Sequence, residues 1–272
     1  MTIASKSKRV SFDADPRDYH ENENFKCYGD PEPHIRSQRI IYRSGDYKWH
    51  IKVTFQGTIL YKGDTQGLLN EQKKRTVRGR QLRNFIQYIE FESLPLLDDT
   101  VTEVVFEPSN TNQQPRSVKL PLGSNIMNLP ADNGYRQFSG QFDYRIIEDL
   151  SKIFYPPLPR NCSVAVLPFS NIRKVRDIAP AISLVQIASQ KQDYIFKSID
   201  RPLYQPRDSY IIQRELLNLE LLRQSPGIIQ LVSIIGSGNP YHTGRSKDHS
   251  NVLRGFLLEY HTDGTLEETL EK

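Results

Sequence analysis

The sequence predicts an α+β fold, in which a β-rich region at residues 35–155 precedes a region at residues 160–272 with an antiparallel sheet and one packed helix. Three observations support this prediction. Apolar residues from Trp49 to Phe55 alternate with polar ones, as in a half-buried strand. Residues 210–223 have the apolar spacing of a helix, and Ser-Pro-Gly at 225–227 ends it. Two strand candidates precede that helix and two follow it, which is typical of a small α+β domain.

The first part of the chain is polar before it becomes β-rich. Residues 1–34 are rich in Asp, Glu and Asn, and we expect a loosely ordered leader there. After it we predict strands at 49–55, 100–106 and 117–122, an extension of the first strand at 58–61 with a turn at 62–64, a helix at 81–91, a polar loop at 110–116, an irregular stretch at 123–140 and a short helix at 146–154. Prolines within 156–159 mark the clearest boundary in the chain.

Beyond that boundary the residues become more β-branched. Residues 162–169 are apolar and β-branched. We predict strands at 181–188, 194–199, 228–235 and 253–260, a helix at 210–223, a polar glycine-containing loop at 236–251, and the first turns of a helix within 262–272. Asp208 is the expected N-cap of the long helix, because a carboxylate there accepts hydrogen bonds from the first free backbone N–H groups.

Composition excludes several classes of protein. The chain has 272 residues, 37% of them hydrophobic, and no apolar run long enough to span a bilayer. The first nine residues are polar and basic, so no secretory signal is expected. Two cysteines cannot build a disulfide framework, and the six histidines show no paired spacing for a metal site. We therefore expect a soluble intracellular protein, cytoplasmic or nuclear.

The formal net charge of +4 includes a dense basic run at residues 71–83. One interpretation is a surface that binds nucleic acid or another anionic surface. The alternative, which we favour, is a solvated basic helix face or loop, because no stacking aromatic side chains interrupt the charges. The basic residues of this run are Lys73, Lys74, Arg75, Arg78, Arg80 and Arg83.

Two charged residues occupy positions where packing alone would favour apolar side chains. Lys197 lies inside the apolar segment YIFKSI, and Glu215 shares a helical face with Ile211, Leu219 and Leu222. Because a carboxylate on an apolar stripe is costly to desolvate alone, a lysine on a neighbouring strand would be its natural partner. The alternative is that Lys197 lies on the exposed face of an edge strand and Glu215 at the rim of the helix.

Four short segments in order resemble the small lobe of the protein kinases. YIFK at 194–197 resembles the lysine strand, and RELL at 214–217 resembles the regulatory helix with its glutamate. SPGIIQL at 225–231 is similar to the joint that follows this helix. FLLEY at 256–260, followed by GTL at 264–266, resembles the last strand and the hinge. Together these segments cover roughly residues 165–272.

The resemblance implies specific roles in ATP binding. It assigns phosphate contact to Lys197 and the supporting ion pair to Glu215. It places Leu258 at the back of the adenine pocket. Backbone hydrogen bonds to adenine would come from the hinge at Glu259, Tyr260 and His261.

The departures from the kinase pattern bear on activity. Residues 175–185 contain no glycine, so the usual glycine-rich cover over the phosphates is missing, and Ile195 would crowd the adenine. The catalytic loop and the metal-binding Asp-Phe-Gly would lie after residue 272. We therefore expect this chain to be a fragment of a longer kinase or a non-catalytic relative, with magnesium bound only if a large lobe is supplied.

The sequence thus leads to two hypotheses from different classes. The first is a protein-kinase-like chain that binds ATP, weakly if at all, with a link through the family to Ser/Thr protein phosphorylation. The second is a non-catalytic, pseudokinase-like interaction module that binds a protein or an anionic surface. Whether the chain is an enzyme stays open at this point, and a nucleic-acid-associated role rests on the basic run alone.

Overall fold

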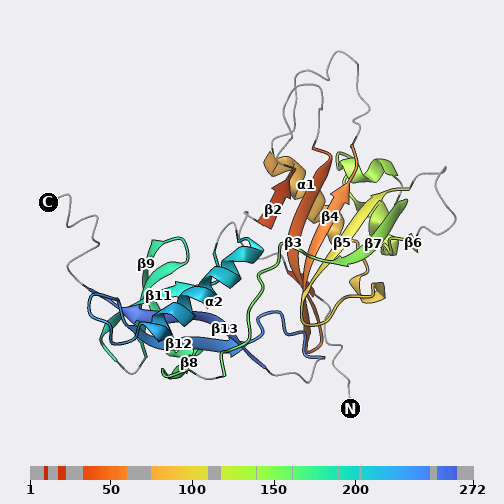
Figure 1. The fold of residues 1–272 in the computed structure, drawn as a ribbon. Coiled ribbons are helices and arrows are strands. Elements are labelled where there is room, and N and C mark those ends of the chain that lie inside the picture. The colour runs from red at the N-terminus through yellow and green to blue at the C-terminus, as the bar shows by residue number, and fades with distance from the viewer. Residues whose placement is uncertain are drawn as a thin grey trace. The chain divides into compact units, whose positions relative to one another are not determined.

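The computed structural model describes residues 9–11, 18–22, 33–59, 75–109, 118–138, 140–160, 162–188, 190–201, 204–245 and 250–261. The chain forms two compact units (Figure 1). Unit 1 comprises Met1–Leu150 and Tyr241–Lys247, and unit 2 comprises Ser151–Pro240 and Asp248–Lys272. Within the residues just named, each unit combines a sheet with one α-helix, so the predicted α+β class is confirmed. Among the described residues, no helix has the length and apolar character needed to cross a membrane.

Unit 1 is built on a seven-stranded sheet in the order β1-β3-β4-β5-β7-β6, with β2 also paired to β3. The β4–β5 pair is parallel and the other pairs are antiparallel. The strands are β1 (Arg9–Ser11), β2 (Tyr19–Glu21), β3 (Ile35–Ser44), β4 (Tyr47–Gln56), β5 (Val101–Pro108), β6 (Val118–Lys119) and β7 (Phe142–Glu148). The helix is α1 (Arg75–Ile86), and the short 3₁₀ helices are η2 (Phe91–Ser93), η3 (Ser124–Asn128) and η4 (Gly134–Phe138).

The core of unit 1 lies between α1 and one face of this sheet. Alternate residues of β4 are buried there, as the period of two predicts. Phe85 of α1 stacks on Phe106 of β5 with ring centroids 5.2 Å apart, and on Tyr135 with centroids 4.9 Å apart. This aromatic cluster anchors the helix to the sheet.

Several predictions for unit 1 differ from the structure. The predicted helix at 146–154 is wrong, because β7 is a strand in which Phe142, Tyr144 and Ile146 alternate toward the core. The predicted helix at 81–91 begins six residues earlier and ends at Ile86. Within the polar leader, β1 and β2 are strands paired with β3 rather than loose chain. The predicted turn at 62–64 and loop at 110–116 lie outside the described residues.

A segment distant in sequence completes unit 1. The backbone N–H of Lys48 donates to Thr243 O at 3.1 Å, and the N–H of Thr243 donates to Asp99 Oδ1 at 3.0 Å. The guanidinium of Arg245 lies 4.9 Å from the ring centroid of Trp49, within cation–π distance. His242 Nδ1 is 3.3 Å from Asp99 Oδ1. Part of the predicted polar loop at 236–251 is therefore held by specific contacts.

Unit 2 is built on a six-stranded sheet in the order β8-β12-β13-β11-β10-β9. The sheet is mixed and not wholly antiparallel as predicted, because among the described strands the β8–β12 pair is parallel and the other pairs are antiparallel. The elements are β8 (Val166–Pro168), the 3₁₀ helix η5 (Phe169–Asn171), β9 (Ile172–Ala179), β10 (Ile182–Ile187), β11 (Asp193–Ser198), α2 (Pro206–Leu221), β12 (Leu231–Gly238) and β13 (Asn251–Glu259).

Apolar clusters cover both faces of this sheet. On one face, Ile212 and Leu216 of α2 pack with Phe256 and Leu258 of β13. On the other face, Phe196 of β11 packs with side chains of β10, β12 and β13. The two faces of the sheet therefore present two separate surfaces, of which α2 covers one.

The predicted strands at 181–188, 194–199, 228–235 and 253–260 are confirmed as β10 to β13, with ends shifted by up to three residues. The predicted N-cap is wrong by three positions. Gln205 is the N-cap of α2, and Asp208 is the third helical residue, whose Oδ2 accepts a hydrogen bond from the Gln205 N–H at 2.7 Å. β9 was not predicted, and the helix expected within 262–272 lies outside the described residues.

Candidate functional site

Lys197 and Glu215 form an ion pair in unit 2. The Lys197 Nζ is 2.8 Å from Glu215 Oε1 and 2.6 Å from Oε2, so both carboxylate oxygens accept hydrogen bonds from one ammonium. The side chains are 32% and 31% exposed. The pair predicted from the sequence is therefore formed, at a position where solvent or a ligand can reach it.

The alternation of β11 directs Lys197 toward α2. Tyr194 and Phe196 belong to the cluster on the far face of the sheet, whereas Ile195 packs in the cluster that contains α2. Lys197 follows Ile195 by two residues and therefore shares its face. β11 lies between β10 and β13, so the alternative that Lys197 sits on an edge strand is wrong.

Glu215 lies beside the buried row of α2 rather than on it. Ile212 and Leu216 are the fully buried apolar residues of this helix, and Leu219, one turn after Glu215, is partly buried against the same core. Ile211 and Leu222, which the sequence pattern placed on an apolar face with Glu215, are about half exposed. The carboxylate therefore sits at the rim of the helix and reaches Lys197 from there, which keeps its desolvation cost modest.

The ion pair with Glu215 leaves one N–H group of Lys197 available for a ligand. An ammonium has three N–H groups, and the two carboxylate oxygens use two of them. The remaining N–H and the positive charge suit an anionic oxygen, such as that of a phosphate, whose position the glutamate would help to fix.

The residues that match the kinase hinge are arranged along β13. Leu258 is 8% exposed and pairs in register with Ile195 of β11, on the same face as Lys197. The backbone N–H of Glu259 donates to Gln230 O at 3.3 Å, so this amide is already engaged. Tyr260 and His261 follow the end of the strand, and His261 Nε2 is 3.9 Å from Glu259 Oε2. The structure thus brings Leu258 close to the lysine strand and leaves the remaining hinge positions at the end of β13.

The connection between β9 and β10 is a tight turn of two residues, Pro180 and Ala181. Ala181 has a φ of 63°, which is uncommon for a residue with a side chain. Its carbonyl oxygen accepts a hydrogen bond from the Ser198 N–H at 2.8 Å. A short, anchored turn without glycine offers little backbone for wrapping a phosphate chain.

The basic run at 71–83 is only partly a free surface. Arg78 is buried and forms two hydrogen bonds of 2.7 Å with the carboxylate of Glu21. Arg75 donates to the Tyr19 carbonyl oxygen at 2.8 Å. These contacts attach β2 to α1 and remove Arg78 from any ligand surface. Lys73 and Lys74 lie outside the described residues, Arg80 is exposed, and Arg83 is half-buried.

Gly255 is a structurally important residue that the sequence analysis missed. It lies in β13, directly opposite Ser198 of β11, with a φ of 152°. A Cβ at this position would lie 2.8 Å from Phe196 Cε2 and closer still to the Lys197 carbonyl oxygen. The sequence held one indication of this role, a single glycine inside an apolar strand, because such a glycine often marks a close approach of two backbones.

Metal-ligating and nucleophilic side chains are the other candidates among the described residues. No cluster of three or more His, Cys, Asp or Glu side chains suited to a metal occurs among them. Burial raises the pKa of the Cys162 thiol, which disfavours the reactive thiolate. Comparisons of this chain with models of protein families, with curated proteins and with solved structures found no match.

Proposed function

We propose that unit 2 is a protein-kinase-like small lobe that binds ATP, with Lys197 contacting the phosphates and Glu215 holding the lysine in place. The observation that carries the proposal is the ion pair, with both carboxylate oxygens within 2.8 Å of one ammonium. Its placement supports the same interpretation. Lys197 lies on the third strand of the antiparallel run β9-β10-β11, and the phosphate-contacting lysine of protein kinases lies on the third strand of their sheet.

The same surroundings favour weak binding. Ile195 and Leu258 are paired side by side on the face that adenine would approach, so they narrow that space. The Pro180–Ala181 turn offers no glycine backbone to the phosphates. Nucleotide affinity would therefore depend mainly on the charge of Lys197. In the family, ATP binding serves Ser/Thr protein phosphorylation, which needs a positioned base and a magnesium clamp, and the proposal assigns neither to the described residues.

Thermal unfolding of the full chain with and without millimolar ATP and magnesium tests this proposal. A ligand at about one hundred times its Kd adds roughly 2.7 kcal/mol to the folded state, which raises the unfolding temperature. Lys197→Met removes the charge and should abolish the shift. Lys191→Met is the matched control, because Lys191 is exposed in the connection between β10 and β11. No shift with the unmodified chain, or an equal shift with both variants, would contradict the proposal.

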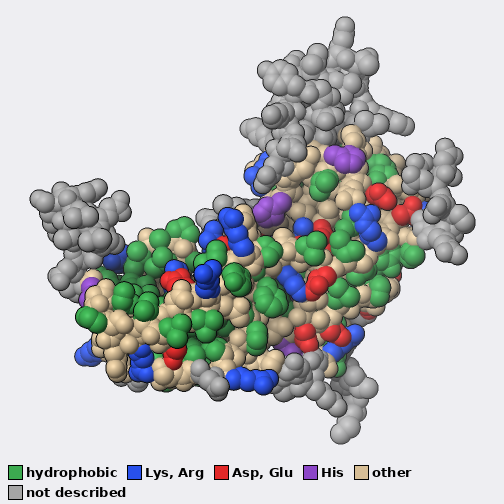
Figure 2. Space-filling view, viewed as in Figure 1, with side chains coloured by type: hydrophobic (Ala, Val, Ile, Leu, Met, Phe, Trp, Pro, Cys, Tyr) green, Lys and Arg blue, Asp and Glu red, His purple; other side chains and the backbone are tan. Residues whose placement is uncertain are grey.

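A second candidate function is a non-catalytic interaction module, and an exposed stripe on α2 favours it. Tyr210, Leu217 and Leu221 are 64%, 58% and 82% exposed, and their spacing of seven and four residues places them on one side of the helix. Figure 2 shows hydrophobic side chains among charged ones over the surface where α2 runs in Figure 1. Such a stripe is suited to a protein partner. A folded chain that ignores ATP but loses a partner on Leu217→Glu would support this alternative.

A further inference from the structure

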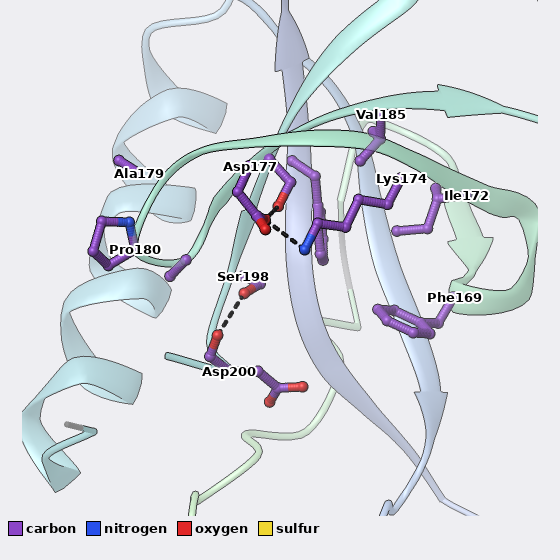
Figure 3. A pocket seen from close by; sticks show the side chains of 12 residues that line it. Phe169, Ile172, Lys174, Asp177, Ala179, Pro180, Val185, Ser198 and Asp200 are labelled. Atoms are coloured by element: carbon purple, nitrogen blue, oxygen red, sulfur yellow. Dashed lines mark hydrogen bonds and ion pairs between the residues drawn. The ribbon is translucent and has the colours of Figure 1, made fainter. Parts of the chain in front are cut away.

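A cavity of about 580 Å³ opens on the face of the unit 2 sheet that points away from α2 (Figure 3). Its floor is formed by Val185 of β10 and Phe196 of β11, which belong to the apolar cluster on that face. Phe169 and Ile172 form one wall. A volume of this size is within the range of small-molecule sites, and such sites are usually lined by apolar and aromatic side chains with a few polar groups.

Irregularities in β9 give the cavity its shape. The register with β10 skips Val175 and Ile178, so each of these residues forms a bulge in the edge strand. Bulges bend a strand and increase its local twist, and they frequently occur next to binding sites. In Figure 3 the β9–β10 hairpin arches over the cavity, and Ala179 and Pro180 lie at its rim. The concavity therefore follows from the backbone of the hairpin rather than from loose side-chain packing.

The charged groups of the cavity are already paired. Lys174 Nζ is 2.5 Å from Asp177 Oδ1 (Figure 3), and Ser183 Oγ donates to the same oxygen at 2.8 Å. Asp200, the other carboxylate of the lining, forms an ion pair with Arg254. Among the described residues, Asp177 Oδ2 keeps its capacity to accept a hydrogen bond. Because each carboxylate of the lining already has a cationic partner, an uncharged ligand fits better than an ion of either sign.

Addition of a peptide strand to β9 is the competing use of this region. β9 is an edge strand, but it carries two bulges, and Arg173 and Arg176 are exposed along it. Bulges and charged side chains are the features by which proteins prevent pairing at sheet edges. The observations therefore favour a ligand inside the cavity over a strand beside it.

We propose that this cavity binds a small, uncharged, flat apolar molecule that carries one hydrogen-bond donor. The rings of Phe169 and Phe196, whose centroids are 6.1 Å apart at a 61° angle, provide aromatic surface for its body. Asp177 Oδ2 accepts its donor. This cavity and the proposed nucleotide site share the Pro180–Ala181 turn, but they lie on opposite faces of β11, because Phe196 and Ser198 line the cavity while Lys197 between them points to the other face.

N-phenyl-1-naphthylamine is a suitable probe, because it is uncharged, aromatic, bears one N–H and fluoresces in apolar surroundings. Titration into the full chain should show saturable binding with one site per chain. Ala179→Trp places a large ring at the rim and should weaken binding at least tenfold. Ile178→Trp is the matched control, because the adjacent Ile178 does not line the cavity, and it should leave binding within about twofold.

Other outcomes would overturn the proposal. These are no saturable binding, equal effects of the two tryptophan variants, or loss of binding on Lys197→Met, which would place the probe on the other face. If Ala179→Trp unfolds the chain, Ser183→Phe can be used instead, because its ring fills the cavity from the floor. It should lower the affinity for the probe by the same factor. The nucleotide test depends on the Lys197 variant, and the probe test depends on the Ala179 variant. Either proposal can therefore be refuted while the other stands.

Discussion

The close approach of β11 and β13 beside the ion pair can be tested at Gly255. The change Gly255→Ala adds a single methyl group to a residue with a φ of 152°, a conformation that residues with a side chain rarely adopt. The added carbon would lie 2.8 Å from Phe196 Cε2, 3.0 Å from Ser198 Cα, and closer still to the Lys197 carbonyl oxygen. Two of these three neighbours are backbone atoms, so the strands would have to separate.

Two effects add to give the magnitude. Holding a residue other than glycine in this backbone conformation costs about 1–3 kcal/mol. Forcing an extra carbon into a filled space costs about 1–3 kcal/mol more, through shifts of the surrounding atoms. We therefore expect Gly255→Ala to lower the free energy of unfolding by roughly 2–6 kcal/mol.

Two other glycines of unit 2 separate these effects. Gly227 has a φ of 77°, and no atom lies within 4 Å of the place that an added methyl carbon would take, so Gly227→Ala reports the backbone strain alone. Gly238 also has open space and no such φ, so Gly238→Ala should change stability by less than about 1 kcal/mol. Urea unfolding followed by circular dichroism gives all three values. If Gly255→Ala costs no more than Gly227→Ala, the close packing of β11 on β13 is refuted.

Two further predictions concern ion pairs. In a double-mutant cycle with Lys197→Met and Glu215→Gln, urea unfolding should give a coupling of about 1 kcal/mol, because the pair is only half-buried, and a coupling near zero would contradict the pairing. Burial alone would raise the pKa of Glu21, but hydrogen bonds from Arg78 and Tyr19 outweigh it, so the pKa lies below its usual value of 4.5. The Glu21–Arg78 ion pair therefore stabilises unit 1 above about pH 4.5. This stabilisation is lost as the pH falls through the lowered pKa that Glu21 has in the folded state. Unfolding midpoints between pH 6 and pH 3 should fall less steeply for Glu21→Gln, and an unchanged slope would disprove the linkage.

The sequence was most informative where a charge occupied an otherwise apolar element. Lys197 and Glu215 stood out because burial of either charge alone is costly, and the structure pairs them. Leu258 is buried beside Ile195, and its place at the back of an adenine pocket stays a prediction. The roles in ATP binding stay predictions, because they came from the resemblance and not from the geometry.

The sequence was least informative where the backbone departs from a regular period. The bulges at Val175 and Ile178 shift the phase of β9 twice, so its side chains show no alternation that could reveal a strand. In β7 the short apolar run Ile146–Ile147 looked helical, although the alternation typical of a strand already begins four residues earlier, at Phe142. The cavity under the β9–β10 hairpin could not be predicted, because it depends on those same bulges.

The origin of the segment Tyr241–Lys247 has a consequence for how the protein is made. Thr243 and Asp99 are hydrogen-bonded across 144 positions of the chain. During synthesis, unit 1 therefore cannot be completed until residues 241–247 have left the ribosome, and most of unit 2 emerges before them. Until then, the ring of Trp49 lacks the arginine that covers it. Nascent chains halted near residue 200 should therefore expose this tryptophan to chaperones, and chains extended past residue 247 should hide it.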